Sequence, residues 1–181
     1  MAAPLDLQDI YNWLLADGMV RKSEVNTLYA HSQAIMKNSP MHPLCAVAHG
    51  KLLSAQPPHK LLTLDALCEW MAHRHQLPFI RIDPLKIDFT KVADVMSASY
   101  AARFHILPVE LTPDMLVVAT SDPNATEWEA EIARLSRRAI RRVIANPLDI
   151  AQYTTQFFSL AKSIKKANKS NSNELALRNN F

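Results

Sequence analysis

The chain contains 181 residues, of which 49% are apolar and 20% are charged, and its formal net charge is +3. This length and composition allow one domain, or two small ones, with a buried core. No apolar run approaches the roughly 18 residues of a membrane span, and the N-terminus has neither the basic start nor the apolar centre of a signal peptide. We therefore expect a cytoplasmic protein without direct membrane insertion.

The positive charge is concentrated at the end of the chain. From residue 162 onward, five lysine and arginine residues stand against Glu174, a net +4, so the preceding residues carry −1. A nearly neutral body lacks the basic surface that nucleic acid requires, and we expect no nucleic-acid binding. The two cysteines, Cys45 and Cys68, lie in apolar helical surroundings and are expected to be buried, reduced thiols.

Residues 1–76 are expected to form a helical subdomain of four short helices. Gly18 is a natural stop for the first helix, Ser23 is placed to cap the second, and prolines follow the second and third. Thr63 opens the fourth helix, which we expect to run to about Gln76.

After Leu77-Pro78 the spacing at which apolar residues recur is no longer that of a helix. Residues 77–164 are expected to form a small β-α-β-β-α-β-α unit with a three- to four-stranded sheet. The expected elements are a strand at 79–82, a helix at 91–105, strands at 106–111 and 115–118, a helix at 125–135, a strand at 139–145 and a helix at 147–162. The predicted fold class is α+β. Residues 165–181 have few apolar side chains and are expected to be a flexible basic tail.

The polar pair Ser121-Asp122, which follows the second strand of the expected hairpin, has two interpretations. The end of a strand is where an α/β protein often keeps its chemistry. It is also where a helix needs a cap, and Asn124 and Glu127 have the spacing of a capping box behind Pro123. We favour the cap, because no histidine or cysteine accompanies the pair in the local sequence.

Glycine is scarce, with two residues in the chain, and this excludes the glycine-rich loops that cradle phosphate groups. Gly50-Lys51 is followed by Leu52 instead of serine or threonine. We therefore expect no ATP hydrolysis, no catalytic residue and no cofactor in this chain. The histidines and cysteines do not supply two pairs at ligand spacing, so we expect no metal site.

Five arginines lie between residues 134 and 142. On a strand, Arg141 and Arg142 belong to different faces, Arg142 with Ile140 and Ile144, and Arg141 with Val143. The cluster either clamps a phosphate or an acidic partner, or lies at a solvated strand edge, which is the interpretation we favour.

Several short motifs occur in one order along the chain, namely LPF at 77–79, DPLKID at 83–88, ILPV at 106–109 and VVATSDP at 117–123. With the upstream stretch WLLADGMVRKSEVNTL, they resemble the N-terminal domain of type II secretion and type IV pilus-assembly ATPases, the general secretory pathway protein E family. The resemblance covers about residues 5–165. It implies a non-catalytic domain ahead of an ATPase core, with the basic tail as the linker into that core.

In this family the region docks on the cytoplasmic part of an inner-membrane platform protein, so the resemblance implies that partner and a peripheral place at the inner membrane. We select Tyr11 and Trp13 as contact residues, because a short helix cannot turn all its large side chains to one small core, and exposed aromatics anchor interfaces. The alternative for Trp13 is packing under the second half of the chain. Arg141 and Arg142 are a second candidate contact, suited to carboxylates.

Some family members bind cyclic di-GMP through two helical repeats that each open with Arg-Leu-Gly. Here Asp9-Ile10-Tyr11 stands at that place, although Gly18 is kept, and the region of a second repeat, 56–79, has no glycine. An aspartate repels phosphate where an arginine would bind it. We therefore expect cyclic di-GMP not to bind, and we keep a cyclic di-GMP-sensing domain as the alternative function. A free-standing small enzyme is a third hypothesis.

Overall fold

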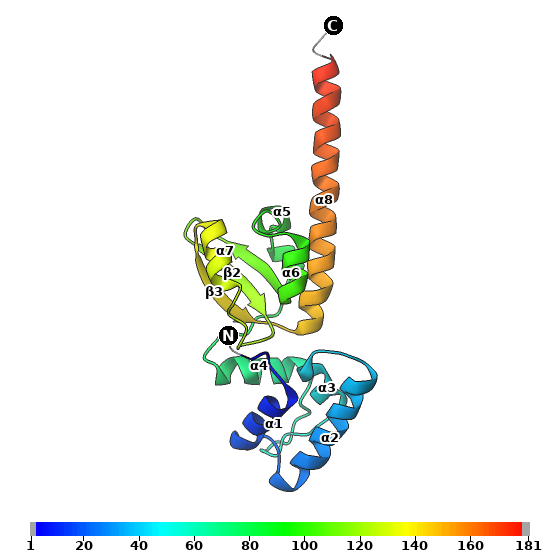
Figure 1. Ribbon diagram of the computed structural model, residues 1–181, viewed down its shortest axis with the longest axis vertical. Helices are drawn as coiled ribbons and strands as arrows, with labels where there is room; N and C mark the ends of the chain where they lie inside the picture. The colour runs from blue at the N-terminus through cyan, green and yellow to red at the C-terminus, as the bar shows by residue number, and fades with distance from the viewer. Residues whose placement is uncertain (1–2, 179–181) are drawn as a thin grey trace.

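A computed structural model describes residues 3–178, which form a helical part, an α+β part and a long projecting helix (Figure 1). The helical part contains α1 (Leu7–Ala16), α2 (Lys22–Asn38), α3 (Pro43–His49) and α4 (Leu64–Arg74). The four predicted helices are therefore present, and residues 1–2 of the predicted subdomain lie outside the described residues. Ile10, Leu14, Leu44, Leu67 and Met71 are fully buried between these helices.

The α+β part is built around a three-stranded sheet. Its elements are η1 (Pro84–Lys86), α5 (Phe89–Val92), α6 (Ala98–Phe104), β1 (Ile106–Leu111), β2 (Met115–Thr120), α7 (Glu129–Ser136), β3 (Ala139–Ile144) and α8 (Pro147–Arg178). The strand order is β1-β2-β3, with β1 and β2 antiparallel and β2 and β3 parallel. This arrangement confirms the predicted α+β class.

Each face of the sheet carries its own apolar layer, because side chains of a strand alternate between the two faces. On one face, Val117 and Val143 pack with Phe157 of α8. On the other face, Val118 packs with Trp128 and with Ile132 of α7. Ala101 of α6 belongs to the same layer as α7, whereas Phe89 of α5 belongs to the layer of α8.

Polar side chains that accept backbone N–H groups begin several of the helices, as expected for N-caps. Among these residues are Asp6 for α1 at 2.8 Å, Thr63 for α4 at 3.1 Å and Ser97 for α6 at 3.1 Å. The prediction was right for Thr63 and wrong for Ser23. Helix α2 begins two residues earlier than a cap at Ser23 requires, at Lys22, and its N-cap residue Arg21 makes no side-chain cap bond.

The predicted strand at 79–82 is reduced to a single parallel bridge between Phe79 and Ile144. The Ile80 N–H donates to the Ile144 carbonyl at 2.9 Å, and the Ile144 N–H donates to the Pro78 carbonyl at 2.8 Å. After this bridge the chain turns away at Asp83, whose side chain accepts the Leu85 N–H at 3.0 Å. The pairing is therefore too short to add a fourth strand.

The predicted helix at 91–105 is also corrected, because two short helices, α5 and α6, occupy this region. Asp88 caps α5 through the Lys91 N–H, and Ser97 caps α6 through the Tyr100 N–H. Each cap begins a new helix, so the Ser97 cap ends the continuity that the alanine-rich sequence suggested.

Helix α8 continues to Arg178, well beyond the end predicted near Lys162. Neither glycine nor proline occurs after Pro147, so no backbone feature stops the helix. Every described residue from Lys162 onward is exposed, so this part of α8 buries no side chain among the described residues. The predicted mobility of the tail is a separate matter and stays a prediction. Residues 179–181 of the predicted tail lie outside the described residues.

Side chains from the two parts bond across their junction. The Asp122 carboxylate accepts the Leu5 N–H at 3.1 Å, and the Asn146 amide donates to Asp65 at 2.9 Å. Ile144 of β3 belongs to the core of the helical part. Along residues 3–178, we find no helix with both the length and the apolar character needed to cross a membrane.

Candidate functional site

The pair Ser121-Asp122 serves the structure of the junction. One Asp122 carboxylate oxygen accepts the Asn124 N–H at 2.8 Å, and the other accepts the Leu5 N–H. The predicted capping box is wrong in detail, because α7 begins at Glu129 and its N-cap residue Trp128 makes no side-chain cap bond. The aspartate nevertheless has the structural role that we favoured, as a turn-forming and bridging residue.

The structure brings His42 close to this pair, which the sequence could not indicate because the residues are about 80 positions apart. The His42 Nδ1 accepts the Leu44 N–H at 3.2 Å and so caps α3. Burial lowers the pKa of His42 to about 4, although Asp122 acts in the opposite direction. A ring that is neutral and already bonded to backbone is a structural group and a poor general base at neutral pH.

A cavity of about 340 Å³ opens beside His42, between the start of the chain and the α6–β1 corner. His105 lies at this corner in the left-handed region, with a φ of 52°, and Arg103 lines the same cavity. Ser121 is 2% exposed. The cavity thus brings together groups that lie far apart in the sequence.

Tyr11 is a core residue, which corrects the prediction that it lies at a contact surface. Its side chain is 2% exposed, and its hydroxyl lies 2.7 Å from the Ser32 hydroxyl and donates to the Leu28 carbonyl at 3.2 Å. Burial raises the pKa of Tyr11. The ring meets Tyr29 edge to face, with 6.0 Å between centroids. Tyr11 therefore holds α2 against α1.

Trp13 of α1 is half-buried against the end of α4 and does not lie under the second half of the chain. Its ring meets His75 edge to face with 4.8 Å between centroids, and the Arg74 guanidinium carbon lies 5.6 Å from the ring centroid. Arg74 forms an ion pair with Asp17, which also accepts the Trp70 indole N–H at 2.9 Å. Burial raises the pKa of Asp17, but the bonds from Arg74 and Trp70 outweigh it, and the net pKa shift is downward.

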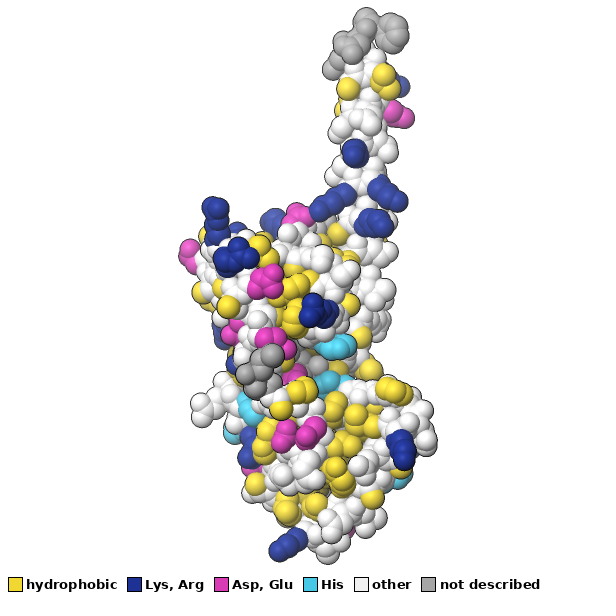
Figure 2. Space-filling model, in the orientation of Figure 1, with side chains coloured by type: hydrophobic (Ala, Val, Ile, Leu, Met, Phe, Trp, Pro, Cys, Tyr) yellow, Lys and Arg dark blue, Asp and Glu magenta, His cyan; other side chains and the backbone are white. Residues whose placement is uncertain are grey.

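An open groove of about 780 Å³ lies between the start of α1 and the outer face of α2. It is lined by Leu5, Asp6, Leu7, Gln8, Tyr29, Ala30, Gln33, Ala34, Met36, Lys37 and Pro43. Figure 2 shows hydrophobic side chains gathered on the helical part of the molecule. Among the residues of α2, only Ser32 is fully covered, so this helix presents most of its surface to solvent. We call this feature the α1–α2 groove.

Arg141 and Arg142 do not form one contact surface. Arg142 lies on the α7 side of β3, where its Nε is 2.5 Å from a Glu129 carboxylate oxygen and its guanidinium donates to the Pro123 carbonyl at 2.9 Å. Arg141 is exposed on the other face, beside a cavity of about 430 Å³ that Arg81 also lines. The opposite faces agree with the strand pattern, and the pairing of the two arginines as one contact is corrected.

The cysteines behave as predicted. Cys45 and Cys68 are both buried and free. Burial raises the pKa of each thiol, so both are protonated and unreactive at neutral pH.

Comparison with known proteins identifies the second half of the chain. Residues 75–164 match the MshEN domain family. The type IV pilus assembly ATPase TfpB of Acinetobacter baylyi is 26% identical over 164 residues, which cover 88% of this chain and 27% of that protein. The chain therefore spans about a quarter of the length of this curated relative.

Two solved structures each match more than four fifths of this chain. A structure of MshE with cdg (cyclic di-GMP) has a TM-score of 0.56 and 17% identity, covering 82% of this chain and 97% of that one. The N-terminal domain of XpsE has a TM-score of 0.42 and 13% identity, covering 83% of this chain and 95% of that one.

These findings place the chain in the class of non-catalytic N-terminal domains of type II secretion and type IV pilus-assembly ATPases. Within that class, residues 75–164 are similar to the MshEN domain family. The resemblance stated from the sequence motifs is thereby confirmed.

Proposed function

We propose that this domain docks a secretion or pilus-assembly ATPase onto the cytoplasmic part of an inner-membrane platform protein. The docked domain would hold the motor peripherally at the inner membrane through its partner. We also propose the division into residues 1–76, 77–164 and 165–181, with the last segment leading into an ATPase core.

The α1–α2 groove is the observation that carries the docking proposal. It is open, it has apolar walls from Leu7, Tyr29 and Met36, and it carries Asp6 and Lys37 at its rim. Apolar pockets with a polar rim are typical of protein interfaces. Tyr11 supports this surface from below through Tyr29, instead of contacting the partner itself.

Two of the residues selected from the sequence remain available for direct contact. Trp13 is half-buried beside Arg74 and keeps part of its ring accessible. Arg141 is exposed and can pair with a carboxylate, whereas Arg142 is already bonded to Glu129. We propose Trp13 and Arg141 as contacts outside the groove.

The test is calorimetric titration of the chain with the platform protein's cytoplasmic domain. Ala34→Glu places a charge in the groove, and Asn26→Glu places the same charge on an exposed position of α2 outside it. We expect the first variant to weaken binding at least about tenfold, or about 1.4 kcal/mol, and the second to bind like the parent.

Trp13→Ala and Arg141→Ala test the outer contacts, after circular dichroism has shown that each variant is folded. If all variants bind like the parent, the groove and these residues are not the interface. If the parent itself does not bind, the docking function of this domain is wrong.

Sensing of cyclic di-GMP is the second candidate, and the MshE structure with cdg is the observation that favours it. In this chain Ile10 and Tyr11 are buried. The start of α1 is acidic, because it carries the carboxylates of Asp6 and Asp9. We expect calorimetry to detect no binding with a dissociation constant in the low micromolar range, which corresponds to a binding free energy of about −8 kcal/mol. A tighter dissociation constant would establish the sensor function.

A further inference from the structure

Four lysines that look scattered in the sequence share one face of α8. Lys162, Lys165, Lys166 and Lys169 are spaced at i, i+3, i+4 and i+7, which aligns them along two turns of a helix. All four are exposed. In Figure 2, basic side chains gather on the projecting helix just above the α+β part.

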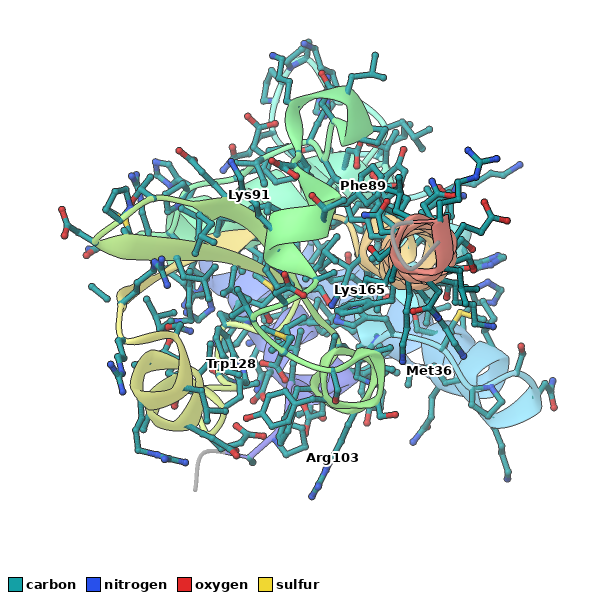
Figure 3. All side chains as sticks on the ribbon, turned by 90° about the horizontal axis from the view of Figure 1, so that it is seen from above. Met36, Phe89, Lys91, Arg103, Trp128 and Lys165 are labelled. Carbon is teal, nitrogen blue, oxygen red and sulfur yellow. The ribbon has the colours of Figure 1, made fainter. Side chains whose placement is uncertain are left out.

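These lysines border a groove of about 470 Å³ between α8 and the segment that joins α5 to α6. The floor is apolar and consists of Ala93, Ala98, Phe158 and Ala161. Figure 3 looks down α8 and shows Lys165 beside this helix, together with Phe89 of the neighbouring α5. We call this feature the lysine groove.

The charge of the lysine groove is mostly uncompensated. Lys165 forms an ion pair with Asp94. Within residues 3–178, the other three lysines have no carboxylate within ion-pair distance. Like charges at i, i+4, as in Lys162 and Lys166, repel one another and destabilise a helix. A ligand with negative charge would relieve this repulsion.

The shape of the groove decides which kind of anionic ligand fits. A bilayer surface is flat and would meet the lysines without reaching the apolar floor beside α6. Nucleic acid needs a longer basic track, and the lysines span only about 10 Å of helix at 1.5 Å per residue. An acidic, amphipathic protein segment satisfies both the charged rim and the apolar floor.

We propose that the lysine groove binds an acidic amphipathic segment of a partner protein. Carboxylates one helical turn apart, about 5.4 Å, pair with the lysines, and apolar side chains between them contact Phe158 and Ala98. The long lysine stems can lie along the apolar floor while their ammonium groups reach the carboxylates. This surface lies on a different element from the α1–α2 groove, so it is a second binding site.

The experiment uses the whole chain and a fluorescent helical peptide of about 18 residues, with leucines on one stripe and glutamates beside it. Fluorescence anisotropy measures binding. The test variant is Lys162→Glu/Lys166→Glu/Lys169→Glu. Its matched control, Lys22→Glu/Lys51→Glu/Lys60→Glu, changes the net charge equally at exposed positions of the helical part. Ala98→Gln fills the floor without changing the charge.

We expect the parent to bind the peptide saturably, the lysine variant to bind at least about tenfold more weakly and the matched control to bind like the parent. Ala98→Gln should also weaken binding, because it blocks the floor. The proposal is overturned if the parent does not bind the peptide, or if the lysine variant and its control lose affinity equally. It is also overturned if anionic vesicles or single-stranded DNA bind the parent more tightly than the peptide does.

Discussion

Mild acid should destabilise this domain through His42. In the folded chain, burial lowers the pKa of His42 to about 4, while the pKa in the unfolded chain is about 6.5. The unfolded state therefore binds more protons between these values, and folding stability falls as the pH drops below about 6.5. From pH 7 to pH 5, this single group accounts for a loss of about 2 kcal/mol.

The groups that face His42 fix the sign of this effect. Asp122 favours the charged ring, but burial and the nearby His105 disfavour it, and the net shift is downward. His75 contributes in the same direction, because burial also lowers its pKa. Protonation of His42 would moreover remove the Nδ1 acceptor for the Leu44 N–H and with it the cap of α3.

Urea unfolding at pH 7 and pH 5 measures the effect, with His42→Asn as the variant. Asparagine is a good N-cap residue and can replace the bond to Leu44 without titrating. We expect the parent to lose about 2 kcal/mol more than His42→Asn over this interval. The control is His49→Asn, at an exposed position of α3, which should keep the parent's pH dependence. Equal losses in the parent and in His42→Asn would show that the reasoning is wrong.

Three further predictions concern the helix ends, the tail and the absence of turnover. Gly18 has a φ of 69°, and a β-carbon there would lie 3.3 Å from the Gln56 side-chain nitrogen. Gly18→Ala should therefore lower the free energy of unfolding, measured by thermal denaturation, by about 1–2 kcal/mol, whereas Ala16→Gly should lower it by at most about 1 kcal/mol. Backbone amides beyond about Lys166 should exchange hydrogen rapidly, since the end of α8 buries no side chain, and strong protection there would contradict this. The purified chain should release no phosphate from ATP, because it lacks the glycines of a phosphate loop, and turnover that survives repurification would count against us.

Local signals in the sequence were sufficient for the helices of the first half and for the strands of the sheet. Gly18 and Thr63 end and begin helices where their residue types predict it. Because side chains alternate between the two faces of a strand, we expected Arg141 and Arg142 on opposite faces, and the structure has them there. Asp88 and Ser97 carried cap signals of the same kind, and reading them would have divided the helix expected at 91–105.

Sequence patterns could not predict the contacts between segments that lie far apart in the chain. Nothing near Tyr11 indicates that Ser32 would bind its hydroxyl, so an aromatic on a short helix could not be assigned to the core or to the surface. The meeting of His42 with Asp122 depends on how the two parts pack. The lysine groove depends on α8 remaining helical after its last buried residue, Ala161, and the absence of glycine and proline was the only signal for this.

The junction between the two parts links the two surfaces that we propose for binding. In β3, Ile144 packs into the helical core while the adjacent Val143 packs into the sheet layer that α8 covers. A rotation of one part against the other would therefore disturb both cores, because packed side chains do not deform continuously. The bonds from Asp122 to Leu5 and from Asn146 to Asp65 oppose the same rotation. We therefore expect a partner in the α1–α2 groove to fix the direction in which α8, with its lysine groove, leaves the domain.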